Sequence, residues 1–247
     1  MPRALITGAS SGIGADLARA FVQGGHSVVL LARRRGRLEA LAQELAPHAA
    51  ILVEDLEDPS APARIHATTG PIDVLVNNAG FGASGPVADI PLDRQRAMLQ
   101  VNITALTELT RRYLPDMLAR RSGRILNVAS TAAFQALPGL AVYAATKAYV
   151  LSFSEALHSE LENTGVTVTC LCPGATDTEF AAIAGMNEAR LFRRAMNSAE
   201  VARRGYAATI AGKRLLVTGL QNRINIIGVR FAPRGLVLSV VRKLLLW

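Results

Sequence analysis

Short apolar runs of strand length alternate with longer segments of helical pattern along most of this chain, and no other feature constrains the fold as strongly. The strand candidates are residues 4–7, 27–31, 50–53, 74–76, 124–128, 166–171 and 215–217. The helical patterns include residues 13–23, 36–45, 94–118, 143–162 and 198–211. Strands and helices that alternate through short loops form right-handed βαβ units. The sequence therefore predicts an α/β fold with a doubly wound parallel sheet of about seven strands and helices on both faces.

A glycine-rich segment follows the first strand candidate and opens the first helix. Its candidate phosphate-binding residues are Gly8, Ser10, Ser11, Gly12, Ile13 and Gly14. In a Rossmann-type sheet this turn binds dinucleotides, because glycine permits a tight turn and the helix N-terminus offers free N–H groups to a pyrophosphate. The spacing is Gly-x3-Gly-x-Gly rather than the usual Gly-x-Gly-x-x-Gly. A glycine-rich turn without a ligand therefore stays open as an alternative.

The same segment also fits Gly-x-Ser-x-Gly, the nucleophile-elbow pattern of hydrolases, centred on Ser10. Such an elbow normally follows several strands, whereas only one strand candidate precedes Ser10. None of the four histidines has the position of a triad base late on a loop: His26, His48, His66 and His158. The sequence therefore argues against hydrolysis.

Three arginines follow the second strand candidate, namely Arg33, Arg34 and Arg35. An acidic residue near this position binds the ribose 2′-hydroxyl of NAD, whereas an arginine favours the 2′-phosphate of NADP. A guanidinium can hold a phosphate through two charge-assisted hydrogen bonds. A solvated basic turn is the alternative. The position favours NADP(H), with Arg33 as the main phosphate contact, assisted by Ser10 or Arg34.

Tyr143 and Lys147 are four residues apart in a predicted helix and therefore share one of its faces. A free tyrosine has a pKa near 10 and is a poor base at neutral pH, but a cation one turn away stabilises its phenolate. Ser130 ends a predicted strand, from which its hydroxyl can orient a carbonyl oxygen. The three side chains together suit proton transfer at a carbonyl or alcohol oxygen.

The motifs occur in the order typical of one family, and over residues 1–220 the chain resembles the short-chain dehydrogenase/reductase family, in its NADP-preferring branch of about 250 residues. The matching motifs are Thr7-Gly8-x3-Gly12-x-Gly14, Asn77-Asn78-Ala79-Gly80, Asn102, Ser130 and Tyr143-x3-Lys147. The resemblance implies an oxidoreductase that transfers a hydride between NADP(H) and a small carbonyl or alcohol substrate. It also implies a homodimer or homotetramer, with the helices near residues 94–118 and 143–162 at the interface.

The resemblance assigns a role to each catalytic candidate. Tyr143 would be the general acid and base, and Ser130 would fix the substrate oxygen. Lys147 would hold the nicotinamide ribose and lower the pKa of Tyr143. Asn102 would hold a water molecule that connects Lys147 to solvent.

Further cofactor contacts are implied after three other strands. Asp55 and Leu56 would flank the adenine, and Asn78, Ala79 and Gly80 would line the adenosine ribose. The nicotinamide carboxamide or the phosphates would be contacted by Pro173, Gly174, Thr176 and Thr178. A catalytically silent NADP-binding regulatory or scaffold protein of the same fold stays open as an alternative.

Residues 179–197 correspond to a mobile lid over the substrate in the resembled family. The apolar residues of this segment predict an apolar substrate: Phe180, Ile183, Met186, Leu191, Phe192 and Met196. Its basic residues either meet an anionic substrate or form a solvated helix face: Arg190, Arg193 and Arg194.

The C-terminal extension, residues 221–247, carries a distinct charge. The formal net charge of the chain is +8, and nine Lys or Arg residues but no Asp or Glu lie in residues 201–247. Leu236, Val240 and Leu244 recur at a spacing of four residues, so this segment predicts a basic apolar helix. Two interpretations stay open: the helix packs within an oligomer or over the site, or it lies on a membrane surface.

Other classes of function lack support in the sequence. No basic run is interleaved with aromatic residues as in nucleic-acid binding. Cys170 and Cys172 offer too few ligands for a metal and fit buried strand positions. We expect no signal peptide, no metal and a reducing, cytoplasmic setting, with membrane association through the extension as the open variant.

Overall fold

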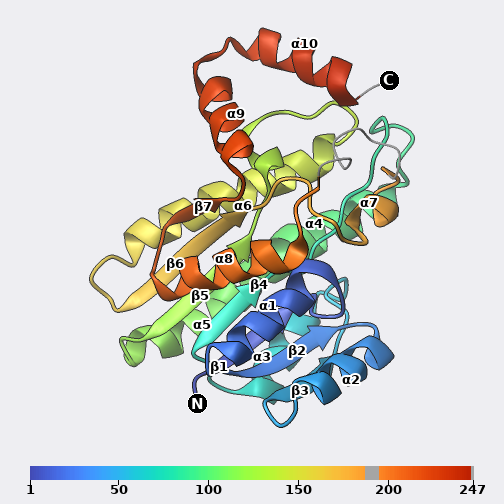
Figure 1. Cartoon of the computed structure of the whole chain (residues 1–247). Coiled ribbons are helices and arrows are strands. Elements are labelled where there is room, and N and C mark those ends of the chain that lie inside the picture. The colour runs from blue at the N-terminus through green and yellow to red at the C-terminus, as the bar shows by residue number, and fades with distance from the viewer. Residues whose placement is uncertain (187–194, 246–247) are drawn as a thin grey trace.

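The computed structural model describes residues 1–186 and 195–245, which form one parallel sheet covered by helices on both faces (Figure 1). The strand order is β3-β2-β1-β4-β5-β6-β7. The strands are β1 (Arg3–Thr7), β2 (Ser27–Ala32), β3 (Ala49–Val53), β4 (Val74–Asn77), β5 (Gly123–Val128), β6 (Val166–Cys172) and β7 (Leu215–Val217). The predicted doubly wound sheet is confirmed, and each strand candidate was placed to within one residue at either end.

The described residues include helices that cover both faces of the sheet and helices that lie outside these layers. They are α1 (Gly12–Gln23), α2 (Arg35–Glu44), α3 (Ala61–Thr69), α4 (Leu92–Leu99), α5 (Leu106–Ala119), α6 (Ala141–Glu160), α7 (Phe180–Ile183), α8 (Ser198–Ile210), α9 (Leu220–Phe231) and α10 (Arg234–Leu245). Side chains that alternate along a strand enter different cores: Ile6 packs with α1, α2 and α8, and Leu5 packs with α3, α5 and α6. Burial on both faces explains why the strands read as continuous apolar runs.

The helix predicted over residues 94–118 is not continuous. The chain passes from α4 through a π-helical segment, Gln100–Ala105, into α5. Short π-helical segments are rare and often lie at functional sites. Here the segment carries Asn102, whose side chain is buried against the loop after β4.

Two helices that follow the last strand form an arm at one end of the molecule, α9 and α10 (Figure 1). Residues 187–194, including Arg190, Leu191, Phe192, Arg193 and Arg194 of the predicted lid, lie outside the described residues. In the described part of the chain, no helix has both the length and the apolar character needed to cross a membrane.

Candidate active site

A cavity of about 520 Å³ lies at the carboxyl ends of the parallel strands, where open α/β sheets bind their ligands. The predicted site residues that line it are Gly8, Ser11, Gly12, Ile13, Gly14, Asn78, Ala79, Gly80, Ser130, Tyr143, Lys147, Pro173, Gly174, Thr176 and Thr178. Those that lie outside its lining are Ser10, Arg33, Arg34, Asp55, Leu56 and Asn102. The fold thus brings together residues from five separate stretches of sequence.

The glycine loop after β1 is locked to the turn after β4. The hydroxyl of Thr7 accepts hydrogen bonds from the backbone N–H groups of Asn78 and Ala79, at 3.0 and 2.9 Å. The side-chain amide of Asn78 donates to the carbonyl of Thr7 at 2.9 Å. A side chain at Gly14 would clash with the Gly8 carbonyl and the Asn78 amide. Asn78 therefore positions the loop through its amide, a role that the sequence did not indicate.

The start of α1 has the character of an anion site. Gly12 opens the helix with φ of +52°, and the preceding Ser11 makes no side-chain cap. The first turn contains no acidic residue. Backbone N–H groups at such a helix end, together with the helix dipole, favour a phosphate.

The arginines after β2 separate into two different environments. Arg34 donates to the hydroxyls of Ser10 and Ser11, at 3.0 and 2.8 Å, and pairs with Glu179 at 2.8 Å. Arg33 instead pairs with Glu57 at 2.7 Å and Asp55 at 3.4 Å. The arginine next to the phosphate loop is therefore Arg34, whereas the sequence analysis expected Arg33 to be the main contact to the 2′-phosphate.

The predicted adenine contacts after β3 are also engaged within the protein. The Asp55 carboxylate accepts from the backbone N–H of Glu57 at 2.9 Å and faces Arg33. Leu56 is buried in the core next to α3 rather than lining the cavity.

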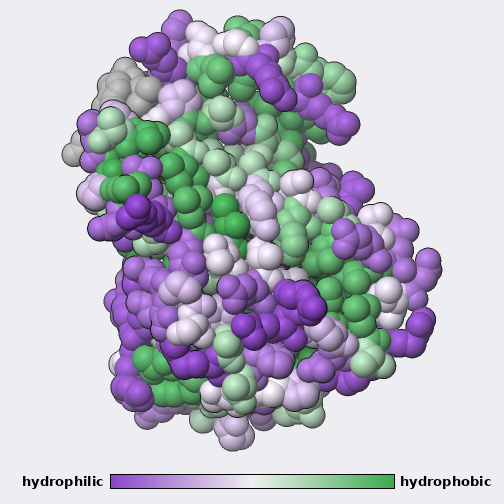
Figure 2. Space-filling view, turned by 180° about the vertical axis from the view of Figure 1, so that it is seen from behind, coloured by the Kyte–Doolittle hydropathy of each residue, from purple (hydrophilic) through white to green (hydrophobic). Residues whose placement is uncertain are grey.

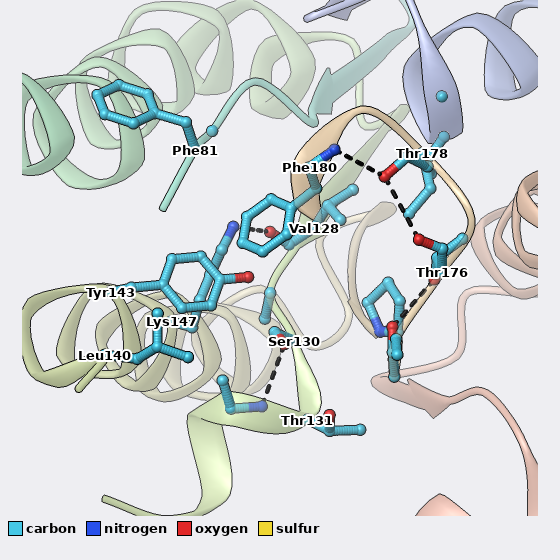
Figure 3. Close-up of a pocket in the computed structure, with 18 of the residues that line it drawn as sticks. Phe81, Val128, Ser130, Thr131, Leu140, Tyr143, Lys147, Thr176, Thr178 and Phe180 are labelled. Atoms are coloured by element: carbon cyan, nitrogen blue, oxygen red, sulfur yellow. Dashed lines mark hydrogen bonds between the residues drawn. The ribbon is translucent and has the colours of Figure 1, made fainter. Parts of the chain in front are cut away.

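Three side chains selected for catalysis meet on one wall of the cavity (Figure 3). Ser130 follows β5, and its hydroxyl accepts from the backbone N–H of Ala132 at 3.1 Å. Tyr143 lies in the first turn of α6, and its hydroxyl points into the cavity. One turn later, the Lys147 ammonium donates to the carbonyl of Val128 at 2.8 Å and lies 5.8 Å from the centre of the Tyr143 ring.

Burial controls the charges of this group. It raises the pKa of Tyr143 to about 12, and a hydrogen bond with Ser130 acts in the opposite direction. It lowers the pKa of Lys147 to about 8. In the protein alone, burial therefore outweighs the effect of Ser130 on the pKa of Tyr143. The phenol is the stable form at neutral pH.

Asn102 connects the turn after β4 to α6. Its side-chain oxygen accepts from the N–H of Phe81 at 3.1 Å, and its amide donates to Thr146 at 3.0 Å. A side chain at Gly80 would lie 3.0 Å from the Asn102 oxygen and 3.3 Å from the Lys147 ammonium. Glycine at this position allows the turn after β4 to approach both groups.

Apolar side chains form the part of the cavity beyond Tyr143. The ring of Phe180, at the start of α7, lies 5.1 Å from that of Tyr143 between ring centres. The other apolar residues of this part come from several elements: Phe81, Leu137, Leu140, Ile183, Met186, Ile226, Val229 and Val241. A substrate at Tyr143 would therefore lie among apolar groups.

The contribution of α9 to the cavity could not be assigned from the sequence alone. Asn222 lies so close to Gly174 that a side chain at that glycine would clash with its amide. Asn222 is held by a bond from its amide to the carbonyl of Thr218 at 2.8 Å. The recurrence of Asn222, Ile226 and Val229 on one helical face is the signal that could have revealed this packing.

Known proteins share both the sequence and the architecture. The family profile described as short chain dehydrogenase matches residues 2–188. A short chain dehydrogenase of Pseudocercospora fijiensis is 39% identical over 188 residues, which cover 72% of this chain but only 61% of that protein. An NADP-dependent 3-hydroxy acid dehydrogenase of Salmonella typhi is 38% identical over 185 residues, or 72% of this chain and 75% of that one. A short-chain dehydrogenase from Sphingobium yanoikuyae, solved in complex with NADPH, superposes with a TM-score of 0.84 at 31% identity, covering 96% and 95% of the two chains.

Proposed function

This chain belongs to the short-chain dehydrogenase family, and we propose that Tyr143 is the general acid and base of its reaction. The protein is an NADP(H)-dependent oxidoreductase that transfers a hydride between the cofactor and a carbonyl or alcohol carbon. The assignment to Tyr143 rests on the orientation of its hydroxyl, which points into the cavity beside Ser130 (Figure 3). Lys147 lies one helical turn away.

The residues around the glycine loop fit NADP(H). The free N–H groups at the start of α1 suit the pyrophosphate, and Arg34 on Ser10 and Ser11 suits the 2′-phosphate. We therefore assign the main 2′-phosphate contact to Arg34 rather than Arg33. When bound, the cofactor supplies or accepts the hydride, and the protein supplies the proton.

Proton transfer follows from the ionisation of the buried groups. Tyr143 is protonated at neutral pH, so it can donate its proton to a carbonyl oxygen during reduction. Bringing its pKa from about 12 to about 7 would need roughly 7 kcal/mol of preferential stabilisation of the phenolate. The Lys147 ammonium contributes part of this stabilisation, and Ser130 donates to the same substrate oxygen. Asn102 would hold the water that returns protons to Lys147.

The apolar part of the cavity points to an apolar carbonyl or alcohol compound. Phe180, Phe81 and Leu140 offer no charge to an anionic substrate beside Tyr143. A small polar substrate would leave this surface in contact with water, at a cost of about 25 cal/mol per Å² of apolar area left exposed.

A homodimer or homotetramer through α5 and α6 also forms part of the proposal. Leu118 and Tyr149 are exposed on these helices, and the Tyr149 ring stacks on that of Phe153 at 5.8 Å between centres. Aromatic residues such as Tyr149 are enriched at subunit interfaces.

Replacement of Tyr143 by Phe tests the assignment. Tyr143→Phe should lower NADPH-dependent turnover of apolar ketones by about 10²- to 10⁴-fold, because the proton donor is lost while the ring remains. The affinity for NADPH, measured by fluorescence titration, should stay unchanged.

Tyr149→Phe is the matched control, since it removes from the same helix a hydroxyl that lies outside the cavity and is paired with Thr107 at 2.9 Å. Equal losses in the two variants would contradict the role of Tyr143. NADPH binding without turnover of any carbonyl compound by the native protein would favour the scaffold alternative.

A further inference from the structure

The arm formed by α9 and α10 presents apolar side chains to solvent on the side opposite the cavity. Four of them recur on one face of α9, which we name the outer stripe: Leu220, Ile224, Ile227 and Phe231, exposed by 73, 53, 59 and 82%. The opposite face of the same helix carries Ile226 and Val229, which line the cavity. The apolar side chains of the outer stripe therefore pack little against the rest of the described residues.

The charge around the outer stripe has a single sign. Arg223 and Arg230 are exposed and seven residues apart, so both lie along one edge of the stripe, roughly a quarter turn from it. On α10, Arg234, Arg242 and Lys243 are exposed as well. From residue 201 to the C-terminus the chain has nine basic residues and no acidic one. Figure 2 shows hydrophobic surface bordered by hydrophilic groups on this upper part of the molecule.

We propose that the outer stripe docks on an anionic lipid membrane and that the cavity behind it takes an apolar substrate dissolved in that membrane. An amphipathic helix with basic residues beside an apolar face binds at a lipid interface by burying the apolar side chains and attracting anionic headgroups. The substrate part of this inference rests on the proposed function; the docking part does not.

A second copy of the chain is a poorer occupant of this surface. A two-fold symmetric contact would place the same patch of both subunits face to face. The contact would then bring Arg223 and Arg230 of both copies together, with no acidic residue of α9 or α10 to offset their charge. A lipid surface supplies the missing negative charge.

The arm connects the two surfaces. Val241 of α10 is 6% exposed and lines the cavity, whereas Leu236 and Val240 of the same helix are 57 and 49% exposed. One short structure thus has an inner side facing the substrate and an outer side facing solvent. A compound that leaves the membrane at the outer stripe would therefore have to cross only the thickness of this arm to reach the cavity.

Vesicle flotation of the full-length protein tests the docking. The protein should float with vesicles of phosphatidylcholine and phosphatidylserine, and added salt should weaken its binding. Ile224→Gln with Phe231→Gln should reduce the partition coefficient by about tenfold or more, since two exposed apolar groups are lost. Leu92→Gln, at a similarly exposed position on α4, is the control and should change nothing.

Arg223→Gln with Arg230→Gln separates the electrostatic contribution. Each arginine should account for about fivefold in binding to phosphatidylserine vesicles and for little with phosphatidylcholine alone. No flotation with either vesicle, or equal flotation of the stripe variant and Leu92→Gln, would overturn the docking. A shift of the stripe variant to a smaller oligomer without vesicles would instead assign the stripe to a subunit contact.

The substrate part is read from turnover. With a water-soluble ketone, the stripe variant should match the native rate, because neither altered residue lines the cavity. With a long-chain ketone in the anionic vesicles it should be slower by about the loss in binding. Unchanged turnover of the vesicle-borne ketone would refute delivery from the membrane. Absence of turnover with every ketone would refute the proposed function and leave the flotation result standing.

Discussion

Arg33 and Arg34 are adjacent in sequence, and their hydrogen-bond and ion-pair partners determine which of them can bind the 2′-phosphate of NADP(H). Arg33 faces the carboxylates of Asp55 and Glu57, which already neutralise it. Arg34 lies on Ser10 and Ser11 at the glycine loop, with Glu179 as its only acidic partner among the described residues. A phosphate can replace Glu179 at Arg34 and gain the two serine hydroxyls as further donors.

The two arginines therefore predict unequal effects. Arg34→Gln should weaken NADPH binding by about tenfold or more, as expected for a lost charge-assisted hydrogen bond. Arg33→Gln, its neighbour and control, should weaken NADPH binding much less. NADH affinity should change little in both variants. Fluorescence titration of each variant with both nucleotides provides the measurement, and a larger loss in Arg33→Gln would restore the assignment made from sequence.

At the level of elements, the strands were predictable because burial on both faces leaves an unbroken apolar run in the sequence. The π-helical segment Gln100–Ala105 was not, because Asn102 meets its partner, the backbone of Phe81, only in the folded chain. The position of α9 was not predictable either, because it also depends on contacts that form only in the folded chain. Its apolar residues occur on two faces, and only the folded chain shows that one of them closes the cavity behind Gly174.

The junction of β1, α1 and β4 gives a prediction for stability. Gly14→Ala should lower the free energy of unfolding by about 1–3 kcal/mol, because its methyl group would clash with the Gly8 carbonyl and the Asn78 amide. NADPH binding should weaken as well. Gly36→Ala in α2 is the control, since nothing lies within 4 Å of the added carbon. This variant should be neutral or more stable by about 0.5 kcal/mol. Urea unfolding of the two variants compares them, and equal destabilisation would show that the packing at Gly14 is not tight.

On the scale of the whole molecule, the site is built from segments distant in sequence. The loop after β1, the turn after β4, the ends of β5 and β6 and the inner face of α9 all line one cavity. Most of these residues could be selected from the sequence, since each motif follows a strand. Their convergence follows from the parallel sheet, which brings the carboxyl ends of all its strands to one edge.

A ligand that contacts all these segments should stabilise the entire fold. At a concentration 100 times its dissociation constant, a ligand adds about 2.7 kcal/mol to the folded state. For a chain of this length, about 2–4 °C of Tm per kcal/mol gives a rise of about 5–10 °C with NADPH. Equal concentrations of NADH should give a smaller rise, because NADH offers no 2′-phosphate to Arg34. Differential scanning calorimetry measures both shifts. Tyr143→Phe should keep the full NADPH shift, whereas Arg34→Gln should reduce it to the NADH value. If NADH matched NADPH with the native chain, the 2′-phosphate would contribute no binding energy and the arginines after β2 would have no role in choosing the cofactor.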